Sequence, residues 1–189
     1  MAGVRIRFLG CGDAFGSGGR LQTCILAESN GPSCLIDCGA TSLVALKRAD
    51  VDPNEITTVL ISHLHGDHFG GLPFLILDGQ FAGRSSSLRV AGPPGLEARV
   101  TEAMEAFFPG SSDTRRNFEV HFQELAEGVP ASLGPLRVTP YEVIHACGAP
   151  PYALRIEIHG RVVAYSGDTQ WTNQLIAAAS GADLFICES

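Results

Sequence analysis

The feature that most constrains this chain is the run HLHGDH at residues 63–68, which directly follows an apolar segment. Three imidazoles and a carboxylate this close together form a donor set that suits zinc and related divalent ions. The preceding segment, TTVLIS at residues 57–62, is typical of a buried strand. Side chains alternate in direction along a strand, so we expect His63 and His65 to share one side and hold one ion.

Asp67 and His68 come one step further along the chain and would reach a second ion a few ångströms from the first. The alternative interpretation is a solvated loop in which Asp67 caps the helix that follows. A lone histidine would favour this alternative. Three histidines with an aspartate at this spacing favour a metal site.

Two further candidate ligands stand at the predicted ends of strands. His145 ends the segment at residues 136–145, and Asp168 follows the segment at residues 161–166. Taken alone, they would be a rim histidine and a turn or capping aspartate. With a histidine cluster in the same chain, we expect His145 to complete the ligands of the first ion and Asp168 to bridge both ions.

The pattern of apolar residues predicts strands separated by helices, with no repeat and no linker. We expect an α+β fold, with two β-sheets packed face to face and helices outside, in which residues 1–189 form a single domain. The predicted strands cover residues 4–9, 23–28, 33–37, 57–62, 88–92, 118–122, 136–145, 152–158, 161–166 and 183–188. The predicted helices cover residues 41–49, 72–81, 95–108 and 171–179.

Composition narrows the classes of function and location. A formal net charge of −7 argues against a protein that grips nucleic acid non-specifically through a basic surface. The six cysteines form no CxxC pair and are typical of small buried residues in a reducing compartment. No apolar run is long enough for a signal peptide or a membrane span, so we expect a cytoplasmic protein without a membrane partner.

The run at residues 63–68 resembles the HxHxDH signature of the metallo-β-lactamase superfamily, in its ribonuclease Z-like and phosphodiesterase-like branch. Other segments resemble the same branch: RIRFLGCG its first strand and loop, LIDCG its second, ISHLHGDHFGGLP its metal motif and helix, and AYSGDT its bridging aspartate. The resemblance implies the αββα sandwich and two divalent metal ions, with zinc expected and manganese or iron as alternatives. It assigns the metal ligands to His63, His65, Asp67, His68, His145 and Asp168. It also implies that Asp37 orients a metal-binding histidine.

The chain departs from this branch near its end. The segment ADLFICES resembles the His-Glu-Ala-Thr motif of ribonuclease Z, with Glu188 at the position of the glutamate and Cys187 in place of the histidine. Members usually supply one more metal-binding histidine further on, so we expect a fold that lacks the usual C-terminal end. The segment at residues 84–123 has no long inserted arm of the kind that ribonuclease Z uses to hold transfer RNA, which favours a smaller phosphodiester.

The resemblance implies a metal-dependent hydrolase, a phosphodiesterase or ribonuclease Z-like enzyme in which a hydroxide bridging two metal ions attacks the substrate. Its catalytic candidates are Asp67, which would steer the water, and Glu188, which would assist the leaving oxygen. The expected substrate is a small phosphodiester or an RNA 3′ end, and a homodimer is left open. The alternatives are hydrolysis of a carboxylic ester, thioester or lactam at the same site, or a non-catalytic protein with an incomplete metal site.

Overall fold

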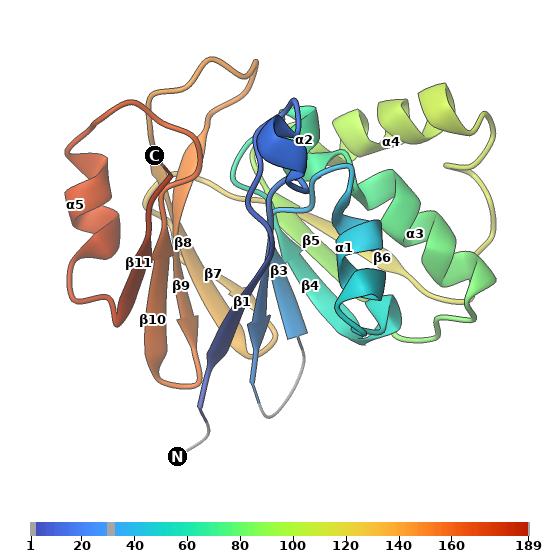
Figure 1. Cartoon of the computed structure of the whole chain (residues 1–189), viewed down its shortest axis with the longest axis horizontal. Helices are drawn as coiled ribbons and strands as arrows, with labels where there is room; N and C mark the ends of the chain where they lie inside the picture. The colour runs from blue at the N-terminus through green and yellow to red at the C-terminus, as the bar shows by residue number, and fades with distance from the viewer. Residues whose placement is uncertain (1–2, 30–32, 189) are drawn as a thin grey trace.

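The computed structural model describes residues 3–29 and 33–188 of the chain. Two β-sheets pack face to face, and helices cover the outer face of each sheet (Figure 1). The αββα sandwich expected from the sequence is therefore confirmed. Among the described residues, no helix has the length and apolar character needed to cross a membrane.

The first sheet contains six strands in the order β1 to β6. Neighbouring strands are antiparallel from β1 to β3 and parallel from β3 to β6. The carboxyl ends of β3, β4 and β5 therefore lie at one edge of the sheet, where loops can gather side chains into a site. The strands are β1 (Arg5–Gly10), β2 (Cys24–Glu28), β3 (Ser33–Ile36), β4 (Ile56–Leu60), β5 (Leu88–Gly92) and β6 (Val120–Glu124).

The second sheet contains five strands in the order β11-β10-β9-β8-β7. Its neighbours are antiparallel except for β10 and β11, which are parallel. The short strand β7 was not expected from the sequence, because three residues carry too little alternation to identify a strand. The strands are β7 (Ala131–Leu133), β8 (Leu136–Glu142), β9 (Tyr152–Ile158), β10 (Arg161–Tyr165) and β11 (Leu184–Ile186).

Helices flank the sandwich on both sides. Those on the first sheet are α1 (Ser42–Arg48), α2 (Gly66–Phe69), α3 (Leu72–Phe81) and α4 (Leu96–Phe107). Helix α5 (Gln174–Ala179) lies against the second sheet on the opposite side (Figure 1). Two short 3-10 helices complete the elements, η1 (Ser17–Gly19) and η2 (Pro53–Glu55).

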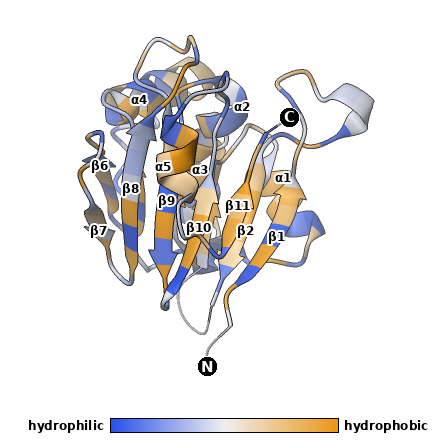
Figure 2. Cartoon of the chain, turned by 90° about the vertical axis from the view of Figure 1, so that its left-hand side faces the viewer, coloured by the Kyte–Doolittle hydropathy of each residue, from blue (hydrophilic) through white to orange (hydrophobic). Residues whose placement is uncertain are grey.

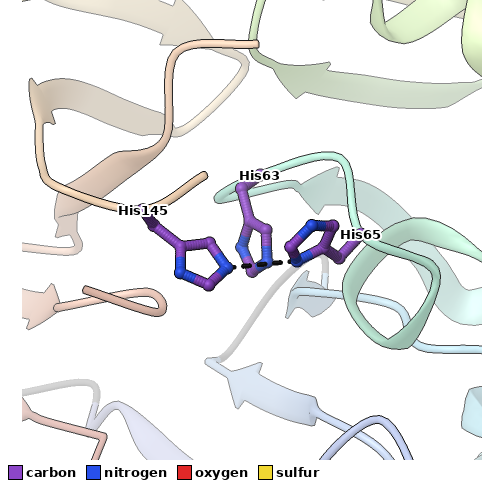
Figure 3. Close-up of side chains that lie close together, drawn as sticks. All are labelled: His63, His65 and His145. Carbon is purple, nitrogen blue, oxygen red and sulfur yellow. Dashed lines mark hydrogen bonds between the residues drawn. The ribbon is translucent and has the colours of Figure 1, made fainter. Parts of the chain in front are cut away.

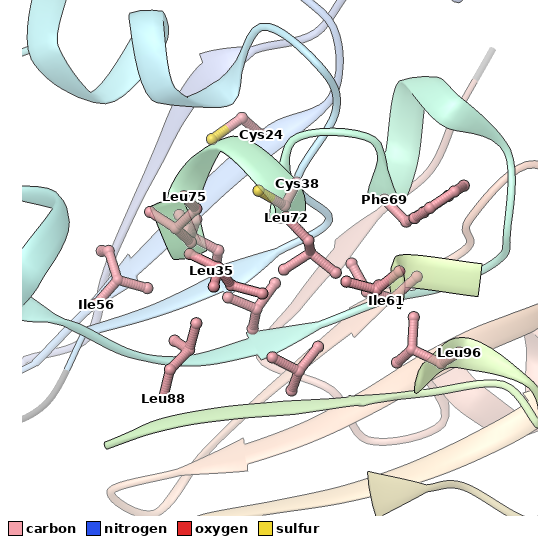
Figure 4. Packing of buried hydrophobic residues seen from close by; sticks show 14 of the residues in the cluster. Cys24, Leu35, Cys38, Ile56, Ile61, Phe69, Leu72, Leu75, Leu88 and Leu96 are labelled. Carbon is pink, nitrogen blue, oxygen red and sulfur yellow. The ribbon is translucent and has the colours of Figure 1, made fainter. Parts of the chain in front are cut away.

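Alternating side chains divide the interior into separate apolar layers. In β2, Cys24 and Leu26 join the cluster under α1, α3 and α4, whereas Ile25 and Ala27 join the cluster between the two sheets. Figure 4 shows the first of these clusters, and Figure 2 shows the alternation of hydrophobic and hydrophilic residues along strands such as β9. Full burial of a leucine-sized side chain contributes about 1.5–3 kcal/mol. These layers hold the sheet edge that carries the histidines.

Two predicted boundaries beside the site were wrong. Strand β8 ends at Glu142 and not at His145, because the two prolines that precede β9 have no amide to continue the ladder. Helix α5 begins at Gln174 and not at Trp171. The preceding residues are held instead by a bridge between Ile144 and Gln170. Both ligand-bearing segments are therefore loops.

Candidate metal centre

The centre forms where β4 leaves the first sheet. His63 lies three residues after the end of β4, is fully buried, and its Nε2 atom has no hydrogen-bond partner among the described residues. A buried polar atom without a partner is costly, and native proteins rarely retain one without a reason such as an ion or a water. His63 Nε2 is thus a first indication that the site accepts a ligand.

Three imidazoles converge at one point of the centre. His63, His65 and His145 each offer one ligand atom, and these atoms all lie within 4.8 Å of one another. His65 Nδ1 lies 3.1 Å from His145 Nε2 (Figure 3). His63 and His65 come from the loop between β4 and α2, and His145 comes from the loop between β8 and β9. These are the three residues that the sequence assigned to the first ion.

A second group of ligand atoms shares His63 with the first. His63, His68 and Asp168 also place one ligand atom each within 4.8 Å of the others. Asp168 Oδ1 lies 3.0 Å from His68 Nε2, and Asp168 Oδ2 lies 3.9 Å from His63 Nε2.

Asp168 and Asp67 extend this arrangement. Asp168 Oδ2 lies 3.8 Å from His145 Nε2, so its carboxylate faces both groups. Asp67 Oδ2 lies 3.4 Å from His68 Nε2. The structure therefore brings together all six predicted ligands, with Asp168 between the two groups.

Hydrogen bonds from Asp37 and Ser62 fix which ring nitrogens face the centre. Ser62 Oγ donates to Asp37 Oδ2 at 2.8 Å and lies 3.1 Å from His63 Nδ1. Because the serine hydroxyl has one hydrogen, His63 Nδ1 must donate to it, which leaves a lone pair on Nε2. His68 Nδ1 lies 2.7 Å from Asp37 Oδ2, an acceptor, so its Nε2 atom faces Asp168.

The backbone around Asp37 is held in an unusual conformation. Asp37 is fully buried and has a φ of 58°, in the left-handed region that non-glycine residues rarely adopt. Its carboxylate also accepts a 2.8 Å hydrogen bond from the Ser62 amide. Just beyond it, a Cβ on Gly39 would stand 2.2 Å from the Asp67 carbonyl oxygen. The loop after β3 is thus fitted closely against the segment that carries the histidines.

The electrostatics of the centre favour a cation. Burial disfavours the charged form of His68, but the Asp37 carboxylate and the hydrogen bonds to Asp168, Asp37 and Asp67 outweigh it and raise its pKa to about 12. Burial and the charge on His68 lower the pKa of His63 to about 4. Three carboxylates therefore stabilise a positive charge on the His68 ring, and two of them, Asp67 and Asp168, face Nε2, where a divalent cation would take the place of the proton.

Glu188, the second predicted catalytic residue, lies beside Asp168. Burial and the neighbouring Asp168 carboxylate raise the pKa of Glu188 to about 8. Its backbone amide donates a 3.0 Å hydrogen bond to Ser166 Oγ at the end of β10. Complete burial of Tyr165, together with Asp37, raises the pKa of this tyrosine well above its usual range. Glu188 thus holds its proton more tightly than an ordinary glutamate, beside the candidate metal ligand Asp168.

The remaining two histidines, His121 and His159, lie outside the centre. His121 lies in β6, where its exposed ring forms an ion pair with Glu119 at 3.1 Å. His159 stands in the turn between β9 and β10 with a φ of 48°.

Two residues of the centre, Ser62 and Thr169, were not predicted from the sequence. Thr169 Oγ1 accepts a 3.1 Å hydrogen bond from the amide of Ile144, beside His145. The sequence did contain a signal for both residues, because Ser62 directly precedes His63 and Thr169 directly follows Asp168.

Comparison with known proteins agrees with this architecture. The chain is 34% identical over 190 residues to the uncharacterized protein Rv1339 of Mycobacterium tuberculosis, covering 98% of this chain and 67% of that protein. It is 33% identical over 156 residues to a ribonuclease Z of Anoxybacillus flavithermus, covering 81% of this chain and 48% of that enzyme. Among solved structures, the short form of human tRNase Z superposes with a TM-score of 0.77 at 24% identity, covering 98% and 76% of the two chains.

These likenesses define a metallo-β-lactamase fold protein of the ribonuclease Z-like branch, as the sequence resemblance implied. Residues 4–187 match the family described as Anti-Pycsar protein Apyc1, and the chain belongs to this family. It spans about two thirds of the length of Rv1339 and about half that of the ribonuclease Z.

Proposed function

We propose that this protein is a metal-dependent hydrolase of phosphodiesters, with two divalent ions at the centre described above. The observation that carries the proposal is the pair of ligand groups that share His63, one of which contains Asp168, whose carboxylate also lies 3.8 Å from His145 Nε2 in the other. The likeness to a ribonuclease Z supports the same class of reaction. One ion would be held by His63, His65 and His145, and the other by Asp67 and His68, with Asp168 between them.

The residues present fit zinc. Imidazole nitrogens and carboxylate oxygens are zinc ligands, and the lone pair on buried His63 Nε2 has no hydrogen-bond partner within residues 3–29 and 33–188. Manganese and iron accept the same donors and are the alternatives. Divalent ions in such a site polarise a phosphoryl oxygen and lower the pKa of a bound water to near neutrality.

Two carboxyl groups are proposed to handle protons. Asp67 lies in the first turn of the short helix α2, and its carboxylate lies 3.4 Å from His68 Nε2, where it can orient the attacking water. Glu188, with a pKa near 8, holds a proton that it can donate to the leaving oxygen. Asp37 and Ser62 act through the histidines, by fixing which nitrogen faces the substrate.

We propose a small phosphodiester as the substrate in preference to an RNA 3′ end. The described segment between β5 and β6 forms the compact helix α4 and a connecting loop, and no extended arm leaves it. The formal charge of −7 also leaves little basic surface for a polynucleotide.

Six cysteines without a disulfide support a cytoplasmic location.

The test is metal content together with hydrolysis of bis(p-nitrophenyl) phosphate by the wild type, His65→Ala and His121→Ala. We expect close to two ions per chain and a rate at least about 100-fold lower in His65→Ala, because a metal ligand is lost. His121→Ala is the matched control, since this histidine is exposed on β6, and it should keep the full rate. Equal rates in both variants, or a protein without metal, would contradict the proposal.

A further inference from the structure

A cavity of about 350 Å³ opens at the side of the sandwich where β1 and β11 are the edge strands. Its walls include Phe8 and Ile25 from the first sheet and Tyr165 and Ile186 from the second. Figure 2 shows β1 and β11 on this side of the molecule. Sites for small molecules usually measure about 300–1,000 Å³, so the cavity can hold one compact group such as a substituted ring.

Two of the lining residues connect this cavity to the metal centre. Glu188 lies beside the candidate ligand Asp168. Tyr165 lies beside Asp37, whose carboxylate holds His68. Glu188 is also the residue proposed above to protonate the leaving oxygen. A leaving group whose oxygen meets Glu188 therefore extends into the cavity.

Arg20 supplies a positive charge to the wall of the cavity. It lies in the glycine-rich loop between β1 and β2. Within residues 3–29 and 33–188, the ion pairs of lysine and arginine all involve other side chains. A guanidinium has a planar set of donors that matches a carboxylate or a phosphate. Arg20 is therefore available to an anionic group on a ligand in the cavity.

Asp13 lines the same cavity but is occupied within its own loop. Its Oδ1 atom accepts hydrogen bonds from the amides of Phe15 at 3.1 Å and Ser17 at 2.9 Å. Its Oδ2 atom accepts a 2.6 Å hydrogen bond from the Ser17 hydroxyl. Both carboxylate oxygens thus have partners in the loop, and Asp13 forms no ion pair that would occupy Arg20 in the described part of the chain.

We propose that the cavity is the leaving-group site and that Arg20 is a specificity-determining residue, which binds an anionic substituent on the leaving group. The inference rests on the proposed function, because it takes the scissile phosphate to lie at the metal centre and Glu188 to meet the leaving oxygen. Arg20 contacts the substituent and not the reacting atoms. It therefore selects among phosphodiesters by the charge of the leaving group.

The kinetic test compares methyl p-nitrophenyl phosphate with methyl 3-carboxy-4-nitrophenyl phosphate, which differ by one carboxylate on the leaving phenol. In Arg20→Ala we expect kcat/KM for the carboxylated diester to fall roughly tenfold, while that for the other diester changes little. Arg20→Lys keeps the charge and should restore part of the preference. Arg115→Ala is the matched control, because Arg115 is exposed in the loop between α4 and β6.

A labelling test reads occupancy of the cavity without turnover. Cys11 and Cys187 line the cavity and are exposed, whereas the other four cysteines are buried. We expect 5-hydroxy-2-nitrobenzoate, the leaving group of the carboxylated diester, to slow alkylation of both thiols by iodoacetamide, measured by peptide mass spectrometry. p-Nitrophenol lacks the carboxylate and should protect much less. Arg20→Ala should abolish the difference between the two phenols.

Two results would overturn the role of Arg20. One is an equal loss of kcat/KM for both diesters in Arg20→Ala, or no loss for either, since a purely structural residue would not distinguish them. The other is equal protection, or none, by the two phenols. Hydrolysis of both diesters with either of these results would leave the hydrolase standing and remove only the inference about Arg20. Selective protection in a protein that hydrolyses neither diester would support the anion site and reject the hydrolase.

Discussion

The two sides of the candidate metal centre differ in how firmly the fold holds their ligands. On the side of β3 and β4, Asp37 and His63 are fully buried, and hydrogen bonds through Ser62 fix their orientation. On the other side, His145 and Asp168 come from loops, and their side chains are 27% and 18% exposed. One side is a framework set before any ligand arrives, and the other is free to adjust around ion and substrate.

The largest effect is expected on the buried side, from Asp37→Ala. The substitution removes the acceptor of the Ser62 amide, the Ser62 hydroxyl and His68 Nδ1, and leaves buried donors unpaired. We expect the free energy of unfolding to fall by about 3 kcal/mol or more, measured by urea denaturation. Asp50→Ala is the control, because Asp50 is exposed and also has a positive φ of 54°. Similar losses in both variants would assign the effect to backbone strain and not to the hydrogen bonds.

The second prediction concerns pH and the metal-free protein. The pKa of His68 is about 12 in the folded chain against about 6.5 when unfolded, so the folded state holds the extra proton between these values. Stability should therefore decrease as pH rises above about 6.5, by at most about 1.4 kcal/mol per pH unit. Urea denaturation of chelator-treated protein near pH 7 and near pH 9 measures this. Zinc-loaded protein should lack the decrease, because the ion replaces the proton, and a flat profile without metal would contradict the charge assignment.

The third prediction addresses the loop side through His145→Ala. This side chain is partly exposed and, in the part of the chain that the structure describes, is hydrogen-bonded only to His65, so the free energy of unfolding without metal should change by less than about 0.5 kcal/mol. Zinc affinity, measured by titration against a chelator of known affinity, should fall at least about tenfold. Stability lost without any loss of affinity would show that His145 belongs to the framework and not to the adjustable side.

The smallest effect is expected from Thr169→Val, which removes the acceptor of the Ile144 amide. One exposed hydrogen bond contributes about 0.5–1 kcal/mol, so the change in stability should lie in this range. Thr169→Ser keeps the hydroxyl and should restore the wild-type value. Native-state hydrogen exchange of the Ile144 amide reads the same contact directly, and unchanged exchange in Thr169→Val would reject the role of this bond in holding the loops together.

The sequence predicted the fold because, in most strands and helices, apolar residues recur at the spacing of the buried face. The boundaries of α3 and β9 agree with prediction, since α3 is a continuous apolar run that follows two glycines and β9 is apolar at alternate positions. The ligand cluster at residues 63–68 was also readable, because neighbours in sequence at the end of a strand must be neighbours in space. Its role as a metal site stays a prediction that the geometry supports.

The sequence could not show how the two loops meet. Beyond the end of β8 at Glu142, the chain is held by a bridge between Ile144 and Gln170, which lie 26 positions apart in the sequence. The pairing of Ser62 with Asp37 was hidden for the same reason, although both residues stood beside recognised segments. Hydrogen bonds between distant segments leave no periodic trace in either one.

By itself, the sequence determined the chemistry of the candidate site: which side chains offer nitrogen and oxygen donors, and which strands present them. The tertiary structure decided how the loops bring His145 and Asp168 to the cluster, and that Ser62 joins Asp37 in fixing the ring nitrogens. The physical reason is the difference in range. Side-chain chemistry and strand period are local properties, whereas convergence of loops depends on the packing of two sheets whose strands are distant in the chain.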